Sequence, residues 1–247
     1  MSKTSSADKA EGKLGGRASA ERVADTLRER IAAGDLTPGT ALREEFTAAG
    51  LNVSRNTLRE GIRLLVAEGL LVQKLHKGAT VRTLTIEEVQ DIYIVRRTIE
   101  LRAIDQSGTA DAARFATLQR AMLTSQGAMN AKAWKDVGTA SLQFHQAIVG
   151  LLGSRKLDDF FRTIVAQLRL AFSMAEDEGR FQAGWIAREA EIGNLIFAGQ
   201  RAEAVNAMTL YLADAERFVI DVVRARLNRA APRGRRYAAD LSGIAPG

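Results

Sequence analysis

A basic helix that leads directly into a basic hairpin is the feature that most constrains the fold of this chain. Ser54 belongs to the residue types that cap helix N-termini. Leu58, Ile62 and Leu65 then repeat at helical spacing and can face a core. The arginines, asparagine and threonine of the segment lie largely off that stripe, and such side chains can read base edges or hold phosphates. The segment is therefore either a DNA-reading helix or an ordinary helix with a solvated basic face.

The neighbouring segments favour the first alternative. The sequence predicts helices over residues 19–33 and 43–49, a third helix from Ser54, and strands at 70–73 and 79–82. Lysines and a histidine fill the hairpin tip between the two strands. This order is typical of a winged helix-turn-helix, whose third helix enters the major groove while the wing touches an adjacent backbone or minor groove.

The second half of the chain is expected to be helical throughout. No proline occurs between residue 85 and Pro232, as in a run of uninterrupted helices. The expected helices cover residues 85–106, 109–129, 131–152, 154–177, 182–198 and 201–228. The predicted fold class is therefore mainly α: an N-terminal winged helix-turn-helix with a small two-stranded wing, followed by an all-α bundle of six to seven helices.

Composition and charge limit the class of protein. The net charge of +6 is concentrated at the two ends of the chain, where nucleic acid could bind. Basic tails also commonly increase solubility, so the charge alone does not distinguish the two interpretations. The absence of cysteine excludes disulfides and thiolate metal sites and fits a reducing compartment. Neither a signal peptide nor an apolar run of about 20 residues occurs. We therefore expect a soluble, cytoplasmic protein without a membrane partner.

Polar side chains interrupt the apolar stripes of the helical half. They are Arg96, His145, Glu189 and Tyr211, with Ser141 one turn before the histidine. A buried arginine is costly unless it is paired or binds an anion. The group is either a structural network, with Arg96 paired to Glu100 or Glu189, or the lining of a ligand pocket inside the bundle. Catalytic motifs are absent, and one of the two histidines is His76 at the hairpin tip, so we do not expect an enzyme.

Several spaced motifs resemble a known family of regulators. Pro38-Gly39, Leu42-Arg43-Glu44, Val53-Ser54-Arg55, Leu58-Arg59-Glu60, Glu68-Gly69-Leu70 and Gly78-Ala79 resemble the GntR family of bacterial transcription regulators. Arg96, Glu100, Phe144-His145 and Ala198-Gly199 resemble the FadR-type C-terminal effector domain. The resemblance covers about residues 19–228 and implies a homodimer that binds a palindromic operator on double-stranded DNA, most often as a repressor. A small metabolite in the helical domain would alter DNA affinity.

The resemblance also implies a division of the chain and a set of DNA contacts. Four segments are expected: a disordered tail (1–18), a DNA-binding domain (19–84), an effector-binding and dimerisation domain (85–228) and a basic flexible tail (229–247). Asn56 stands where threonine is common and Leu58 where valine occurs, so the operator sequence can differ from those of relatives. The family's DNA-contacting positions fall on Ser54, Arg55, Asn56, Thr57 and Arg59, with Lys77 and Gly78 at the wing.

The effector site departs more from the family pattern. Many such domains bind a divalent metal through an aspartate and three histidines, and here only His145 is retained. Ser141 takes the aspartate position, and Glu189 and Tyr211 take two histidine positions. We expect no tightly bound metal and no other cofactor, although weak metal binding at His145 stays open. Arg96 still suits a carboxylate effector through bidentate pairing, unless Glu189 occupies it.

Two other functions compete with this reading. The winged domain of a helical interaction module could bind protein instead of DNA. A small-molecule enzyme could use the cavity of the bundle, with His145 and Glu189 as its working groups.

Overall fold

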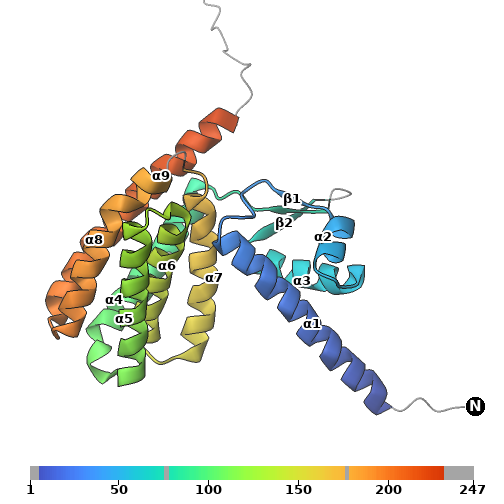
Figure 1. Cartoon of the computed structure of the whole chain (residues 1–247), viewed down its shortest axis with the longest axis horizontal. Coiled ribbons are helices and arrows are strands. Elements are labelled where there is room, and N and C mark those ends of the chain that lie inside the picture. Colours follow the sequence, from blue (N-terminus) through green and yellow to red (C-terminus); the bar gives the residue numbers. More distant parts are fainter. Residues whose placement is uncertain (1–5, 75–77, 176–177, 231–247) are drawn as a thin grey trace, which may run out of the picture.

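The protein consists of a small winged unit and a larger helical bundle placed side by side (Figure 1). The computed structural model describes residues 6–74, 78–175 and 178–230. The winged unit contains α1 (Ser6–Ala32), β1 (Ala41–Leu42), α2 (Glu44–Gly50), α3 (Arg55–Ala67), β2 (Leu71–Lys74) and β3 (Gly78–Val81). The bundle contains α4 (Ile86–Asp105), a 3-10 turn (Ser107–Thr109), α5 (Ala112–Asn130), α6 (Trp134–Gly150), α7 (Arg155–Phe172), α8 (Glu178–Phe197) and α9 (Arg201–Ala230). The predicted fold class is confirmed.

Helix α1 is longer than the sequence indicated. It begins at Ser6 instead of near residue 19, so residues 6–18, predicted to be disordered, are helical. The segment is rich in good helix formers, namely alanine, lysine, glutamate and arginine, and it contains no proline. Their helix propensity outweighs the destabilising effect of its glycines. At the other end, α9 continues to Ala230, and the predicted basic tail beyond it lies outside the described residues.

Helices α1 and α3 pack closely because a glycine stands at their contact. Gly61 of α3 is buried, and a Cβ at that position would lie 2.6 Å from Cγ1 of Val23. Around this contact, Leu27 and Ile31 of α1 are buried. The apolar face of α3 is therefore fixed, and its polar face points away from the core.

The wing is a three-stranded antiparallel sheet, not the two-stranded hairpin that was expected. Its order is β1-β3-β2, with Leu42 opposite Ala79 and Leu71 opposite Val81. Strand β1 could not be predicted from an alternation of apolar and polar side chains, because it has only two residues. Gly78 starts β3 with φ of +74°, a conformation that side-chain-bearing residues rarely adopt.

The bundle buries most of the apolar side chains of α4 to α9 around one core that continues into the winged unit. A capping box fixes the start of α4: Oγ1 of Thr85 accepts from the Glu88 amide, and the Glu88 carboxylate accepts from the Thr85 amide. No helix within the described residues is long and apolar enough to cross a membrane.

The two units meet where α1 ends against α6 and α7, as the adjacent blue and yellow helices show (Figure 1). The Ala32 carbonyl accepts a hydrogen bond from Nε of the buried Arg169 at 2.8 Å and one from Oγ1 of Thr139 at 3.1 Å. The Glu68 carbonyl, at the end of α3, accepts from Nε2 of Gln167 at 2.5 Å. Side chains of the bundle thus hold the C-terminal ends of α1 and α3.

Candidate DNA interface and effector site

Helix α3 presents one apolar face to the core and one polar face to solvent. Oγ of Ser54 accepts the Thr57 amide at 3.1 Å, so Ser54 is the N-cap that the sequence predicted. Leu58, Ile62 and Leu65 are buried, and they anchor the helix. The opposite face exposes the side chains of Arg55, Asn56, Arg59 and Arg63. An exposed basic face on a rigidly seated helix suits insertion into a DNA groove.

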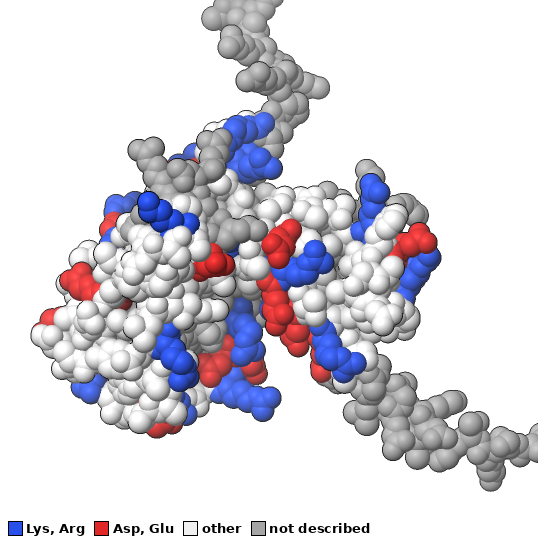
Figure 2. Space-filling model, viewed as in Figure 1, with Lys and Arg blue, Asp and Glu red and all other residues white. Residues whose placement is uncertain are grey.

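Two of the exposed arginines are paired with glutamates of the adjacent helix α2. Nη2 of Arg55 lies 2.9 Å from Oε1 of Glu45, and Nε of Arg59 lies 2.7 Å from Oε2 of Glu44. Basic and acidic side chains therefore stand together on the winged unit, as the right-hand part of Figure 2 shows. Exposed ion pairs are worth at most about 1 kcal/mol, so DNA phosphates or bases can replace the glutamates.

The wing is only partly described. Lys77 lies outside the described residues, so its predicted DNA contact is not placed. Gly78 pairs with Lys74 across the sheet, and a Cβ on Gly78 would lie 3.2 Å from the Leu42 carbonyl. The glycine therefore lets β3 approach β1 closely at the base of the wing.

Inside the bundle, the predicted polar residues form one buried hydrogen-bonded cluster. Nε of Arg96 donates to Oε1 of Glu100 at 2.8 Å, and Nδ1 of His145 lies 2.6 Å from Oε2 of the same carboxylate. Nε2 of His145 lies 3.2 Å from the Tyr211 hydroxyl. Arg96, Glu100 and His145 are each at most 1% exposed. Glu100, one turn along α4, is therefore the partner of Arg96.

Glu189 occupies the other side of the cluster and does not take Arg96. Its Oε1 accepts hydrogen bonds from Oγ of Ser141 at 2.5 Å and from the Tyr211 hydroxyl at 2.8 Å. Its Oε2, and Nη2 of Arg96, are buried without a hydrogen-bond partner among the described residues. The expectation that Glu189 could occupy Arg96 is wrong, because the nearer Glu100 already accepts from it.

The pKa values of the two carboxylates in the cluster are shifted in opposite directions. Burial alone would raise the pKa of Glu100, but Arg96 and His145 outweigh it and hold that pKa below its usual range. Burial raises the pKa of Glu189, and His145, Ser141 and Tyr211 only partly oppose this. Burial also raises the pKa of Tyr211, and Glu189 adds to the rise. Glu100 is thus a paired anion, whereas Glu189 has no arginine partner and its Oε1 lies 3.8 Å from Nε2 of His145, a residue that it shares with Glu100.

The cavity at this cluster is almost filled by side chains. It has a volume of about 10 Å³, close to the room that one water molecule needs. Arg96, His145, Trp185 and Phe218 are among the residues that line it. The two aromatic rings, 6.0 Å apart, form an outer wall, since Phe218 is 40% exposed. A metabolite could fit only if some of the lining side chains move.

The cluster does not fit a divalent metal. Both ring nitrogens of His145 are engaged by other side chains, and the Arg96 guanidinium would repel a cation. Ser141 and Tyr211 offer hydroxyl groups in place of ionised ligands. Across the described ranges, no group of three His, Cys, Asp or Glu side chains could hold a metal ion.

Sequence reasoning found the polar members of the cluster but not its walls. Tyr93, Phe172, Trp185, Ala215, Phe218 and Val219 also line the cavity. Aromatic and aliphatic residues at helical spacing look the same whether they fill a core or border a cavity. The Arg96–Glu100 spacing of four residues was the one usable signal for the pair.

The matches with protein families cover most of the chain. Residues 19–81 match the model described as bacterial regulatory proteins, gntR family, and residues 91–214 match the FCD domain. Among solved structures, the chain is similar to a putative transcriptional regulator GntR from Rhodococcus sp. RHA1. The identity is 33% and the TM-score 0.76, over 82% of this chain and 97% of that one. McbR/YncC from E. coli shares the fold at 16% identity, with a TM-score of 0.72 over 82% and 97% of the two chains.

Curated relatives match mainly over part of their length. The chain is 32% identical to a gluconate operon transcriptional repressor of Bacillus licheniformis over 129 residues, which are 52% of this chain and 53% of the relative. It is 28% identical to an Nta operon transcriptional regulator of Aminobacter aminovorans, over 54% of this chain and 64% of the relative. The chain spans about half the length of the first of these curated relatives.

Proposed function

Because the chain belongs to the GntR family of bacterial regulatory proteins and carries an FCD domain, we propose that it represses transcription as an effector-responsive homodimer on a palindromic operator. It acts on chromosomal DNA in the cytoplasm. Relatives that are named as transcriptional repressors support repression over activation. The observation that carries the proposal is the polar face of α3, held outward by its buried apolar stripe.

The predicted DNA-contacting residues each have a role in this proposal. Arg55 and Arg59 exchange their glutamate partners for guanine edges or phosphates. Asn56 reads a neighbouring base, while Ser54 and Thr57 approach the phosphates near the helix N-terminus. At the wing, Lys77 contacts a phosphate and Gly78 lets the backbone come close. A dimer places two such helices about one helical turn of DNA apart.

The DNA proposal is tested by fluorescence anisotropy on DNA from the upstream region of the protein's own gene. We expect Arg55→Ala and Arg59→Ala each to weaken specific binding by roughly 5- to 150-fold, the effect of losing about 1–3 kcal/mol of base contact. Arg102→Ala is the matched control, because Arg102 is an equally exposed, ion-paired arginine on the bundle. Affinity should also fall steeply with salt.

The alternatives predict different results. A winged domain that binds protein would show no preference among DNA sequences, and Arg55→Ala would leave DNA affinity unchanged. A monomer at the concentrations that saturate the operator, measured by sedimentation velocity, would contradict the homodimer. Turnover of a small molecule that disappears in His145→Ala would favour an enzyme.

We place the effector at the buried cluster. Nη2 of Arg96 is a buried cationic atom of this cluster that has no acceptor among the described residues, so a small carboxylic acid is the ligand that it suits. Since the cavity holds only about 10 Å³, binding requires Trp185 and Phe218 to move. Ligand binding would thus favour a second conformation of α8 and α9, by its differential affinity for the two states.

A thermal-shift screen of small mono- and dicarboxylic acids tests this site. We expect at least one acid to raise the Tm of the wild type but not the Tm of the Arg96→Lys variant. Lysine keeps the positive charge but lacks the planar guanidinium that pairs with a carboxylate through two hydrogen bonds. Arg97→Lys is the matched control, because Arg97 is the next residue along α4 and pairs outside the cluster with Glu216 at 2.6 Å. An equal shift in both variants would place the ligand elsewhere.

A further inference from the structure

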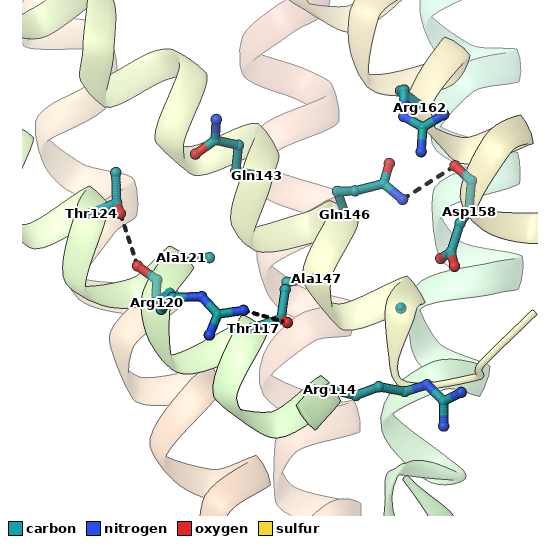
Figure 3. A pocket seen from close by; sticks show the side chains of 11 residues that line it. Arg114, Thr117, Arg120, Ala121, Thr124, Gln143, Gln146, Ala147, Asp158 and Arg162 are labelled. Carbon is teal, nitrogen blue, oxygen red and sulfur yellow. Dashed lines mark hydrogen bonds between the residues drawn. The ribbon is translucent and has the colours of Figure 1, made fainter. Parts of the chain in front are cut away.

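A cleft much larger than the cavity of the buried cluster opens between α5, α6 and α7. Its volume is about 510 Å³, against about 10 Å³ at the cluster, and it is within the range of metabolite pockets. Figure 3 shows it from close by, with side chains from all three helices around it. A molecule of metabolite size fits this cleft without a rearrangement of the core.

The cleft and the cluster lie on different faces of α6. Gln143 and Gln146 line the cleft, whereas Ser141 and His145 line the cavity of the cluster. Arg96 does not line the cleft, so the two cavities share a helix but not a cationic group. A ligand in the cleft would therefore contact other side chains than a ligand at the effector site proposed above.

The cleft carries an excess of positive charge. Arg114, Arg120 and Arg162 line it, and Asp158 is its one lining carboxylate, so the lining has a net charge of +2. Nη2 of Arg120 donates to Oγ1 of Thr117 at 2.9 Å, and no carboxylate in the described part of the chain pairs with Arg120. Arg120 is thus the group that an anion would find most accessible.

The other two arginines have partners of their own. Arg114 pairs with Asp111 at 2.9 Å and Arg162 with Asp159 at 3.0 Å, each three residues away along the helix. Such partly exposed pairs contribute little energy, so a ligand phosphate could replace either aspartate at little cost.

Hydrogen-bond acceptors lie at the end of the cleft away from Arg120. Nε2 of Gln146 donates to the Asp158 carbonyl at 3.2 Å, as the dashed line in Figure 3 shows. Oε1 of Gln146 and Oδ1 of Asp158 are buried and accept no hydrogen bond from any described residue. Burial raises the pKa of Asp158, which agrees with a carboxyl group short of donors. Because neither atom is exposed, ligand hydroxyl groups would supply the missing donors once the Gln146 and Asp158 side chains rotate towards the cleft.

We propose that the cleft binds a phosphorylated sugar or polyol. Its phosphate pairs with Arg120, and its hydroxyls donate to Gln146 and Asp158. A phosphate carries close to two negative charges at neutral pH and three acceptor oxygens, so it can pair with Arg120 and also with a second arginine that exchanges its aspartate, which the single charge of a carboxylate does less well. A burial penalty on two unpartnered acceptors favours a hydroxylated ligand over a bare anion.

Isothermal titration calorimetry on the full chain tests the proposal, with glucose 6-phosphate as the probe. We expect saturable binding that is at least tenfold weaker in Arg120→Ala and in Gln146→Leu, which removes the proposed hydroxyl acceptor without a change of charge. Arg102→Ala is the control for Arg120→Ala, since Arg102 is an exposed arginine of the bundle outside the cleft, and its affinity should equal that of the wild type. Arg96→Lys should also bind the probe normally, which separates this site from the buried cluster.

Three matched compounds decide the ligand class. Glucose tests the need for the anion, inorganic phosphate tests the need for the hydroxyls, and glucuronate tests phosphate against carboxylate. Each should bind at least tenfold more weakly than glucose 6-phosphate. No heat of binding with glucose 6-phosphate, an affinity unchanged in Arg120→Ala, or equally tight binding of any of the three compounds would overturn the proposal.

Discussion

The substitution Glu100→Gln removes the anion that pairs with two buried groups, and we expect it to be among the most destabilising single changes in the bundle. Glu100 is fully buried and lies 2.8 Å from Arg96 and 2.6 Å from His145. The substitution keeps the shape but leaves the Arg96 charge uncompensated, and breaking a buried pair in this way costs about 3–5 kcal/mol. For a chain of this size, that loss lowers Tm by roughly 6–20 °C.

The assay is urea unfolding at pH 7, followed by far-UV circular dichroism at one fixed protein concentration. The matched control is Glu216→Gln, which breaks the partly exposed pair with Arg97 and should cost less than about 1 kcal/mol. Because the pKa of Glu100 is lowered, its stabilising charge is present at pH 7 and is lost only as the pH falls through that lowered value. A cost for Glu100→Gln no larger than for the control would refute the argument that this cluster holds the bundle together.

The other variants test the second carboxylate, the helix cap and the arginine pairs. Since burial raises the pKa of Glu189, the folded protein binds its proton more tightly than the unfolded chain, and stability falls as pH rises above about 4.5 towards the raised value. Glu189→Gln should flatten this slope and raise the free energy of unfolding at pH 8 by roughly 1–3 kcal/mol, and an unchanged pH profile would contradict it. Ser54→Ala should cost about 1 kcal/mol in urea unfolding, more than Ser154→Ala, whose capping bond is longer at 3.4 Å; equal costs would count against the cap. Glu44→Gln should strengthen binding to random-sequence DNA by up to about fivefold in anisotropy titrations, because it frees Arg59 from its pair; unchanged affinity would show that this pair does not compete with DNA.

The fold could be predicted from the sequence wherever one pattern recurs over a whole element. Helix α3 follows its cap and its stripe of leucines and isoleucine, and the proline-free stretch gave the helices of the bundle with small shifts at their ends. Strand β1 could not be predicted because two residues carry no periodicity, and its partner Thr80 is distant in sequence. The early start of α1 was missed because glycines and charge indicate disorder even where helix formers dominate.

The site was predictable in its members but not in its pairings. Arg96, His145, Glu189 and Tyr211 stand out because polar groups on apolar stripes are rare, and the structure brings all four together. The sequence does not show whether Arg96 pairs with Glu100, one turn away on the same helix, or with Glu189 on another helix. The packing of the helices decides this. The cleft beside Arg120 left no trace in the sequence, because its residues read as ordinary solvated helix faces.

The contacts between the two units give the cluster a route to the DNA-binding helix. Ser141 lies two residues beyond Thr139 on α6, and Phe172 lies three residues beyond Arg169 on α7. Ser141 and Phe172 line the cavity of the cluster, while Thr139 and Arg169 hold the Ala32 carbonyl at the end of α1. A ligand that turns or shifts α6 or α7 therefore also moves the end of α1. Since α1 packs tightly against α3 at Gly61, the movement would reach the arginines that face DNA. A measurable test is whether Thr139→Val and Arg169→Met, which remove the bonds to Ala32, weaken the effect of a bound acid on operator affinity while leaving acid binding itself intact.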